Sequence, residues 1–127
     1  MQSIARVLLE LVDSLGLVAN AEKVGTAFTT MMRQALGGHK NVADVRGEGL
    51  MMAVELAEDC GARKFFDPAA KIGPAIAAAL LKRGIISRAM PQGDILGFAP
   101  PLCITESEAR IVVDATREAV EEVLGTE

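Results

Sequence analysis

The sequence is poor in several residue types on which common enzyme sites depend. Its 127 residues include no tryptophan, no tyrosine, four phenylalanines and one histidine, His39. A nucleophilic triad needs a histidine base, and a metal centre needs several ligands close together, so neither is expected. His39 itself stands in a Gly-Gly-His-Lys segment and is expected to be a solvated loop residue.

The chain also lacks the features of secreted, membrane-bound and nucleic-acid-binding proteins. Its two cysteines, Cys60 and Cys103, are too few for a disulfide framework, and we expect two reduced thiols. It contains no secretory signal and no run of about 20 apolar residues. The formal net charge of -4 leaves no basic surplus to neutralise phosphates. We therefore expect a soluble cytoplasmic protein without a nucleic-acid or membrane partner.

Two helices are predicted at the start of the chain. Apolar residues recur at helical spacing over 3–16 and again over 20–36. Gly16 ends the first helix and Asn20 is the predicted N-cap of the second. The apolar stripe of the first helix consists of Ile4, Val7, Leu8, Leu11, Val12 and Leu15.

Short apolar segments bounded by turn residues predict the strands. They lie at residues 42–46, 50–56, 85–88 and 95–98. Between the first two lies Arg-Gly-Glu-Gly, residues 46–49, whose glycines allow either two antiparallel strands or one long strand with a kink.

Two further helices are predicted in the second half of the chain. The third is expected to begin between residues 69 and 73 and to end at Lys82-Arg83-Gly84, because an earlier start would place Pro74 inside it and kink it. The last begins at a capping box, Thr105 with Glu108, and runs to about Leu124.

The order of these elements is α-α-β-β-α-β-β-α. Mostly antiparallel strands in a small sheet, with helices on one face, make an α+β two-layer sandwich. Half of the residues are hydrophobic, too many for a disordered chain, and the length suits one domain over residues 1–127.

Two segments are unusual, although each taken alone also fits a plain structural role, a surface arginine in the first and a turn in the second. Arg88 ends the apolar strand Ile-Ile-Ser-Arg and leads into the loop Ala-Met-Pro-Gln-Gly-Asp, where a cation is placed to bind an anion. The second segment is Gly-Phe-Ala-Pro-Pro-Leu-Cys-Ile-Thr-Glu, residues 97–106, whose two prolines make a rigid corner between a strand and a capped helix.

Together these segments resemble a known family. Arg-Gly-Glu-Gly-Leu-Met-Met-Ala-Val-Glu-Leu (46–56), Arg-Gly-Ile-Ile-Ser-Arg (83–88) and residues 97–106 are similar to the C-terminal small domain of class III pyridoxal-phosphate-dependent aminotransferases. The branch they resemble most is that of the ω-amino acid:pyruvate and amine transaminases. The resemblance covers nearly the whole chain and implies the same α+β layer.

The resemblance implies that a large domain lies upstream of this region in the complete enzyme. In the family, that domain holds pyridoxal phosphate (PLP) through a Schiff-base lysine, and none of the lysines here matches it. The resemblance therefore predicts a truncated, substrate-side domain that is inactive alone and has no cofactor-binding or catalytic residue of its own. An upstream PLP domain and a small-molecule amine or keto acid are its implied partners.

The residue carried over from the family is Arg88. In amine and ω-amino acid transaminases, a mobile arginine at this place binds substrate carboxylates and swings away for apolar groups. Many family members have a second carboxylate-binding arginine at the place of Gly97, so α-amino acid specificity is in doubt. Arg88 is thus the candidate substrate-binding residue, since a guanidinium binds a carboxylate through two parallel hydrogen bonds.

Two classes of function remain open at this point. The chain is either a piece of a class III aminotransferase that works with a large domain, or a stand-alone, non-enzymatic binding module kept for its surface. A reading frame for a large domain directly upstream would favour the first. In both cases an unpartnered first helix predicts a homo-oligomer.

Overall fold

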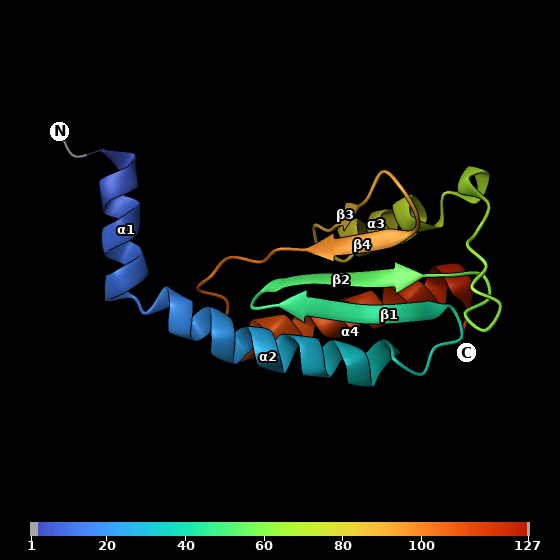
Figure 1. Cartoon of the computed structure of the whole chain (residues 1–127), viewed down its shortest axis with the longest axis horizontal. Helices are drawn as coiled ribbons and strands as arrows, with labels where there is room; N and C mark the ends of the chain where they lie inside the picture. Colours follow the sequence, from blue (N-terminus) through green and yellow to red (C-terminus); the bar gives the residue numbers. More distant parts are fainter. Residues whose placement is uncertain (1–2, 127) are drawn as a thin grey trace.

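The computed structural model describes residues 3–126. Over that range it contains four α-helices, four strands and one short 3-10 helix (Figure 1). The elements in chain order are α1 (Ile4–Ser14), α2 (Leu17–Leu36), β1 (Val42–Glu48), β2 (Met51–Leu56), η1 (Pro68–Ala70), α3 (Ile72–Lys82), β3 (Arg88–Ala89), β4 (Ile95–Phe98) and α4 (Glu106–Leu124).

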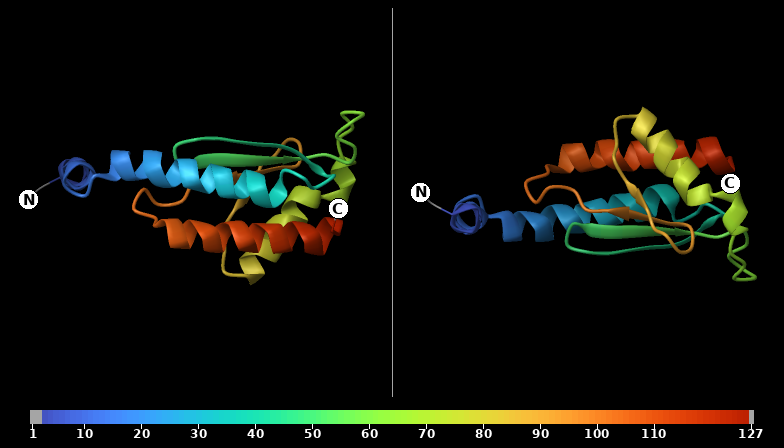
Figure 2. Two further views of the ribbon diagram at one scale, coloured as in Figure 1. Left: turned by 90° about the horizontal axis from the view of Figure 1, so that it is seen from below. Right: turned by 90° about the horizontal axis from the view of Figure 1, so that it is seen from above.

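The strands form one antiparallel sheet in the order β1-β2-β4-β3. Helices α2, α3 and α4 lie together on one side of this sheet, as the two views of Figure 2 show. The α+β two-layer architecture expected from the sequence is therefore confirmed. β1 and β2 are two separate strands joined at Gly49, whose φ of 56° lies in the left-handed region that favours glycine.

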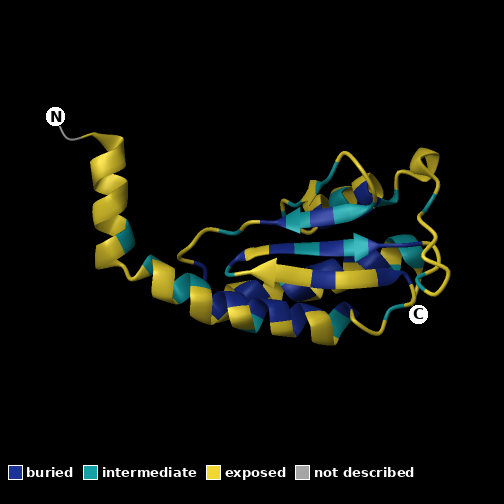
Figure 3. Ribbon diagram, in the orientation of Figure 1, coloured by how far each residue is buried: buried dark blue, intermediate teal, exposed yellow. Residues whose placement is uncertain are grey.

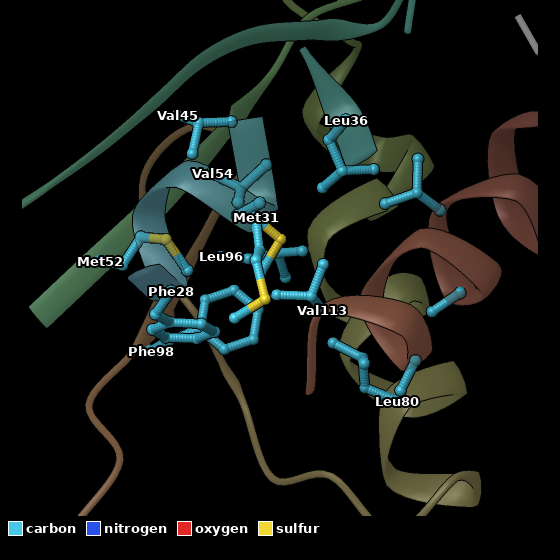
Figure 4. Close-up of a cluster of buried hydrophobic side chains, with 14 of the residues drawn as sticks. Phe28, Met31, Leu36, Val45, Met52, Val54, Leu80, Leu96, Phe98 and Val113 are labelled. Carbon is cyan, nitrogen blue, oxygen red and sulfur yellow. The ribbon is translucent and has the colours of Figure 1, made fainter. Parts of the chain in front are cut away.

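The hydrophobic core lies between the sheet and the three helices (Figures 3 and 4). Phe28 of α2 and Phe98 of β4 meet edge to face, with ring centroids 6.3 Å apart and ring planes at 90°. Around this pair, each of the three helices and the strands β2 and β4 contribute fully buried side chains. Those with the largest volumes are Phe28, Met32, Leu36, Leu56, Ile76, Leu80, Leu96, Val54, Val120 and Thr116.

Side chains alternate between the two faces of the sheet. In β2, Met52, Val54 and Leu56 are buried against the helices, whereas Met51 is exposed on the opposite side. The same period of two in β4 buries Leu96 and Phe98. No helix covers the second face among the described residues, and we call it the open face (Figure 2).

The boundary between the first two helices differs from the prediction. α1 ends at Ser14, and Gly16 turns the chain with a φ of 59°, so α2 begins at Leu17 rather than at residue 20. Asn20 therefore lies inside the helix, and its predicted role as N-cap is wrong. One glycine in the left-handed conformation suffices to separate the two helices.

The two ends of α3 explain why Pro74 does not disturb the helix and why β3 begins later than predicted. Pro74 is harmless because α3 begins at Ile72, and the first turn of a helix has N–H groups without intrahelical partners. At the other end, the N–H groups of Gly84 and Ile85 bond back to Leu81 and Leu80 in a Schellman motif. This motif occupies the start of the predicted strand 85–88, so β3 begins only at Arg88.

His39 is half-buried and bonded rather than solvated. Its Nδ1 accepts a hydrogen bond from the Asn41 N–H at 3.1 Å, and its Nε2 lies 2.7 Å from the Gly125 carbonyl oxygen. Since Nδ1 accepts, Nε2 carries the proton and donates it to that carbonyl. His39 thus ties the loop after α2 to the end of α4.

The packing of α2 on the β1–β2 turn requires Gly25. A Cβ atom at this position would overlap the carbonyl group of Gly49. We predict that Gly25→Ala lowers the free energy of unfolding by about 1–3 kcal/mol, because neither backbone can give way easily. Urea unfolding with Gly38→Ala as the control checks this, since nothing lies within 4 Å of a Cβ there. Equal stability of both variants would contradict the packing.

Helix α1 stands away from the rest of the chain and contributes nothing to the core (Figures 1 and 3). Its predicted apolar stripe is largely exposed: Leu8 is 57% accessible and Leu15 is 61% accessible. An amphipathic helix with no partner leaves an apolar surface that tends to associate with another.

We predict that the isolated chain self-associates through this stripe. Leu8→Glu combined with Leu15→Glu should shift the chain toward the monomer, because charges on the stripe oppose its burial. Leu9→Glu is the matched control, since Leu9 is exposed on the other side of the same helix. Light scattering across a concentration series measures this. A wild-type chain that stays monomeric at high concentration would contradict it.

Candidate functional site

A row of four cross-strand partners crosses the open face. Arg46 of β1 pairs with Ala53 of β2, Ala53 pairs with Gly97 of β4, and Gly97 pairs with Arg88 of β3. Directly paired residues point to the same face of a sheet. Two arginines therefore flank two of the smallest residues. Arg88, the candidate from the sequence, lies opposite Gly97, where many family members have an arginine.

This row lies in an apolar pocket of about 570 Å³, which we call pocket 1. Met52 and Phe98 reach it at the edge of the core, and Met51, Ile86 and Met90 line it from the open face. Glu48 is its one acidic residue among the described residues. Pocket 1 therefore combines apolar walls with two guanidinium groups.

The two arginines of pocket 1 are in different states. The Arg46 guanidinium bonds the Glu55 carboxylate at 2.7 Å and the Asp44 carboxylate at 3.2 Å. These hydrogen bonds, the one to Glu55 foremost, raise the pKa of Arg46 above its ordinary value. Arg88 is exposed and, within residues 3–126, has no side-chain hydrogen bond or ion pair. Arg46 is thus neutralised, whereas Arg88 is free to bind an anion.

The position of Arg88 follows from the end of α3 and from pairing with β4. Once the Schellman motif at Gly84 ends the helix, three residues lead to the first cross-strand pair. Arg88 then faces the open side because Ala89 pairs with the buried Leu96. The two paired residues of β3 point to opposite faces of the sheet, and this alone directs the Arg88 side chain to the open face.

Asn20, which the sequence predicted as an N-cap, instead holds the Pro-Pro corner after β4 through its side chain. The Asn20 side-chain amide donates to the carbonyl oxygens of Leu102 at 2.7 Å and Ile104 at 3.1 Å. Prolines supply no N–H donors, so carbonyls near them need donors from elsewhere. No local signal in the sequence points to this role, because both acceptors lie more than 80 residues from Asn20 in the chain.

The corner ends in the predicted capping box, which is confirmed. The Thr105 hydroxyl accepts from the Glu108 N–H at 3.2 Å, and the Glu108 carboxylate accepts from the Thr105 N–H at 3.1 Å. Hydrogen bonds from the Thr105 hydroxyl and then its backbone N–H hold the pKa of Glu108 below its ordinary value of 4.5. Asn20 and this box together fix the part of the corner that leads into α4.

A second pocket lies next to pocket 1 on the open face. It has a volume of about 770 Å³ and is called pocket 2. Its lining comes from the loop before α3, from the β3–β4 loop and from the edge of β2. Lys71 lies there together with the carboxylates of Glu55 and Asp94.

Other kinds of site are not found in the described part of the chain. Residues 3–126 include no group of three His, Cys, Asp or Glu residues that could hold a metal ion. No helix in that range combines the length and apolar character needed to cross a membrane. Cys60 and Cys103 are both free thiols, as expected.

Comparison with known proteins identifies the family. A family model described as aminotransferase class III matches residues 1–120. The chain is 46% identical over 115 residues to a diaminobutyrate–2-oxoglutarate transaminase of Halomonas elongata and 33% identical over 120 residues to an adenosylmethionine-8-amino-7-oxononanoate aminotransferase of Methanocaldococcus jannaschii. These matches cover 91% and 94% of this chain. The chain belongs to the class III aminotransferases.

Solved structures agree with this assignment. An (S)-enantioselective omega-transaminase from Thermomicrobium roseum superposes with a TM-score of 0.85 at 34% identity over 91% of this chain. An amine transaminase from an uncultivated Pseudomonas species, solved in a PLP-bound form, gives a TM-score of 0.86 at 33% identity over 94%. The chain spans only about a quarter of the length of these proteins, 24% to 26%.

The family implies PLP in the complete enzyme, but the residues of this chain do not fit that cofactor. Pocket 1 has no lysine among its described lining residues. Pocket 2 contains Lys71, but the carboxylates of Glu55 and Asp94 share it and would repel a phosphate group. Neither pocket combines an amine with a phosphate cradle, so no step through the cofactor is assigned to these residues.

Loss of the Asn20 amide should loosen the Pro-Pro corner. We predict that Asn20→Asp, which keeps the size but removes both donors, lowers the free energy of unfolding by about 1–3 kcal/mol. Two carbonyl oxygens then lose their partners and face a carboxylate. Chemical denaturation measures the change, and Gln34→Ala on the exposed side of the same helix is the control. A loss no larger than that of the control would mean that the corner is stable without Asn20.

Proposed function

We propose that this chain is the substrate-side small domain of an aminotransferase that moves an amino group from an amine or ω-amino acid to a keto acid of the pyruvate type. The rest of the enzyme would hold PLP, which supplies the chemistry of amino-group transfer. The task of this chain would be to bind and orient the carboxylate and the carbon skeleton of the substrate. As a fragment, it would be inactive alone.

The observation that carries this proposal is the free guanidinium of Arg88 at an apolar pocket. Arg46, the other arginine of pocket 1, is already bonded to Glu55 and Asp44. Because these two carboxylates compensate the charge of Arg46, a carboxylate entering pocket 1 would be attracted chiefly by Arg88. The planar guanidinium binds a carboxylate through two parallel hydrogen bonds, and the apolar walls would contact the carbon skeleton of the substrate.

Gly97 supports the preference for amines and ω-amino acids. It lies opposite Arg88 in the sheet and has no side chain to bind a second carboxylate. A substrate with one carboxylate group, or with none, therefore needs no second cationic side chain on this surface. The neighbours described as omega and amine transaminases are consistent with this preference.

The Halomonas relative adds a constraint on the acceptor. It is described as using diaminobutyrate and 2-oxoglutarate, and both compounds carry carboxylates. A free arginine suits either a pyruvate-type acceptor or 2-oxoglutarate, so the identity of the keto acid is best determined by comparing these two in one assay.

A hybrid enzyme tests the role of Arg88. In it, this chain replaces the matching 115-residue segment of the Halomonas elongata transaminase. We predict that Arg88→Ala in the hybrid lowers kcat/KM about ten- to a hundredfold for an ω-amino acid, because a charge-assisted contact worth about 1.5–3 kcal/mol is lost. A plain amine, which has no anion, should lose little.

Arg88→Lys is the matched control for charge. Lysine keeps the charge but cannot form the two parallel bonds, so activity toward the ω-amino acid should fall between those of the wild type and Arg88→Ala. Equal losses on the ω-amino acid and the plain amine would mean that Arg88 is structural and does not bind the substrate carboxylate.

A further inference from the structure

Met90 extends the pairing of β3 and β4 by one more residue. Its N–H donates to the Ile95 carbonyl oxygen at 2.9 Å, directly after the pairs Arg88–Gly97 and Ala89–Leu96. Because successive side chains alternate between faces, Met90 lies on the open face together with Arg88. The residue next to the candidate carboxylate-binding arginine on that face is therefore a long, flexible thioether.

The Met90 side chain fills the space that Gly97 leaves. A Cβ atom at Gly97 would overlap the terminal methyl group of Met90 and would lie 3.9 Å from its sulfur. Diagonal neighbours on a sheet are within reach of long side chains, and methionine adapts to irregular gaps. A glycine at 97 and a methionine at 90 are thus two halves of one packing arrangement.

Met90 also separates the two pockets. Among the described residues, it is the one that lines both pocket 1, with Arg88 and Gly97, and pocket 2, with Ile95 and Phe65. The two volumes are about 570 Å³ and 770 Å³. Removing the thioether would open pocket 1 toward a second space larger than itself.

We infer that Met90 is a specificity-determining residue that limits the length of the apolar group accepted beside Arg88. The inference rests on the proposed function. With Met90 in place, the alkyl chain of an amine donor ends within pocket 1. The same packing predicts that any side chain introduced at 97 displaces the terminal methyl group of Met90.

The packing can be tested on the 127-residue chain alone. With carbon-13 in the methionine methyl groups, the six methionines give separate NMR signals, and Met90→Leu identifies that of Met90. Gly97→Ala should shift the Met90 signal strongly, because the new methyl group displaces it. The signal of Met31, buried in the core on the other side of the sheet, should not move. An unmoved Met90 signal would overturn the inference.

The specificity can be tested in the hybrid enzyme with plain amines whose alkyl chains increase in length. We expect Met90→Ala to raise kcat/KM for the longest amine relative to the shortest by about tenfold, in the range that a few methylene groups can contribute. Leu81→Ala is the control, because Leu81 is an exposed apolar residue of α3 that lines neither pocket. It should leave the chain-length preference as it is in the wild type.

The outcomes distinguish this inference from the proposed function. If Arg88→Ala selectively lowers activity on ω-amino acids but Met90→Ala leaves the chain-length preference unchanged, the function stands and the role of Met90 is wrong. If Met90→Ala shifts the chain-length preference and Leu81→Ala does not, the inference holds.

Discussion

The register of β4 is the constraint on which the site depends. Leu96 and Phe98 are buried against the helices, and Phe98 meets Phe28 edge to face, so β4 cannot slip by one residue without exposing both side chains. That register turns Gly97 toward the open face and pairs it with Arg88 and Ala53. The burial of apolar groups on one side of the sheet thus fixes the polar arrangement on the other. Four residues are enough for this coupling, because successive side chains of β4 point to opposite faces of the sheet.

Burial on one side of the sheet also explains why its two faces have different roles. Helices α2, α3 and α4 pack on one face of the sheet and stabilise it. The open face carries pockets lined by exposed apolar side chains such as Met51 and Ile86. Helix α1 adds another exposed apolar surface at one end (Figure 3). A chain that spans a quarter of the length of its relatives and exposes two such surfaces is consistent with a domain that is completed by further protein. Fold and family follow from this chain, whereas catalysis as a whole would need the remainder of the enzyme.

Much of this was predictable from the sequence, and the failures have physical causes. Periodicity identified α2, α3 and α4, and the capping box located the start of α4, because those signals depend on neighbouring residues. The strand at 85–88 was misplaced because a Schellman motif extends the influence of α3 to Ile85. Asn20 was misread because its partners, Leu102 and Ile104, are more than 80 residues away in the chain. Arg88 was singled out as a cation at the end of an apolar strand, and the family resemblance added its expected role, but its pairing with Gly97 and the place of Met90 required the register.

The central claim is that this chain can serve as the substrate-side domain of a class III aminotransferase. The measurement that tests it most directly is amino-group transfer by the unmutated hybrid, assayed with an ω-amino acid donor and with pyruvate or 2-oxoglutarate as acceptor. We predict PLP-dependent turnover within about tenfold of the Halomonas parent, because the exchanged segments are 46% identical over 115 residues. A hybrid that folds and binds PLP as the parent does, yet turns over neither keto acid, would contradict it.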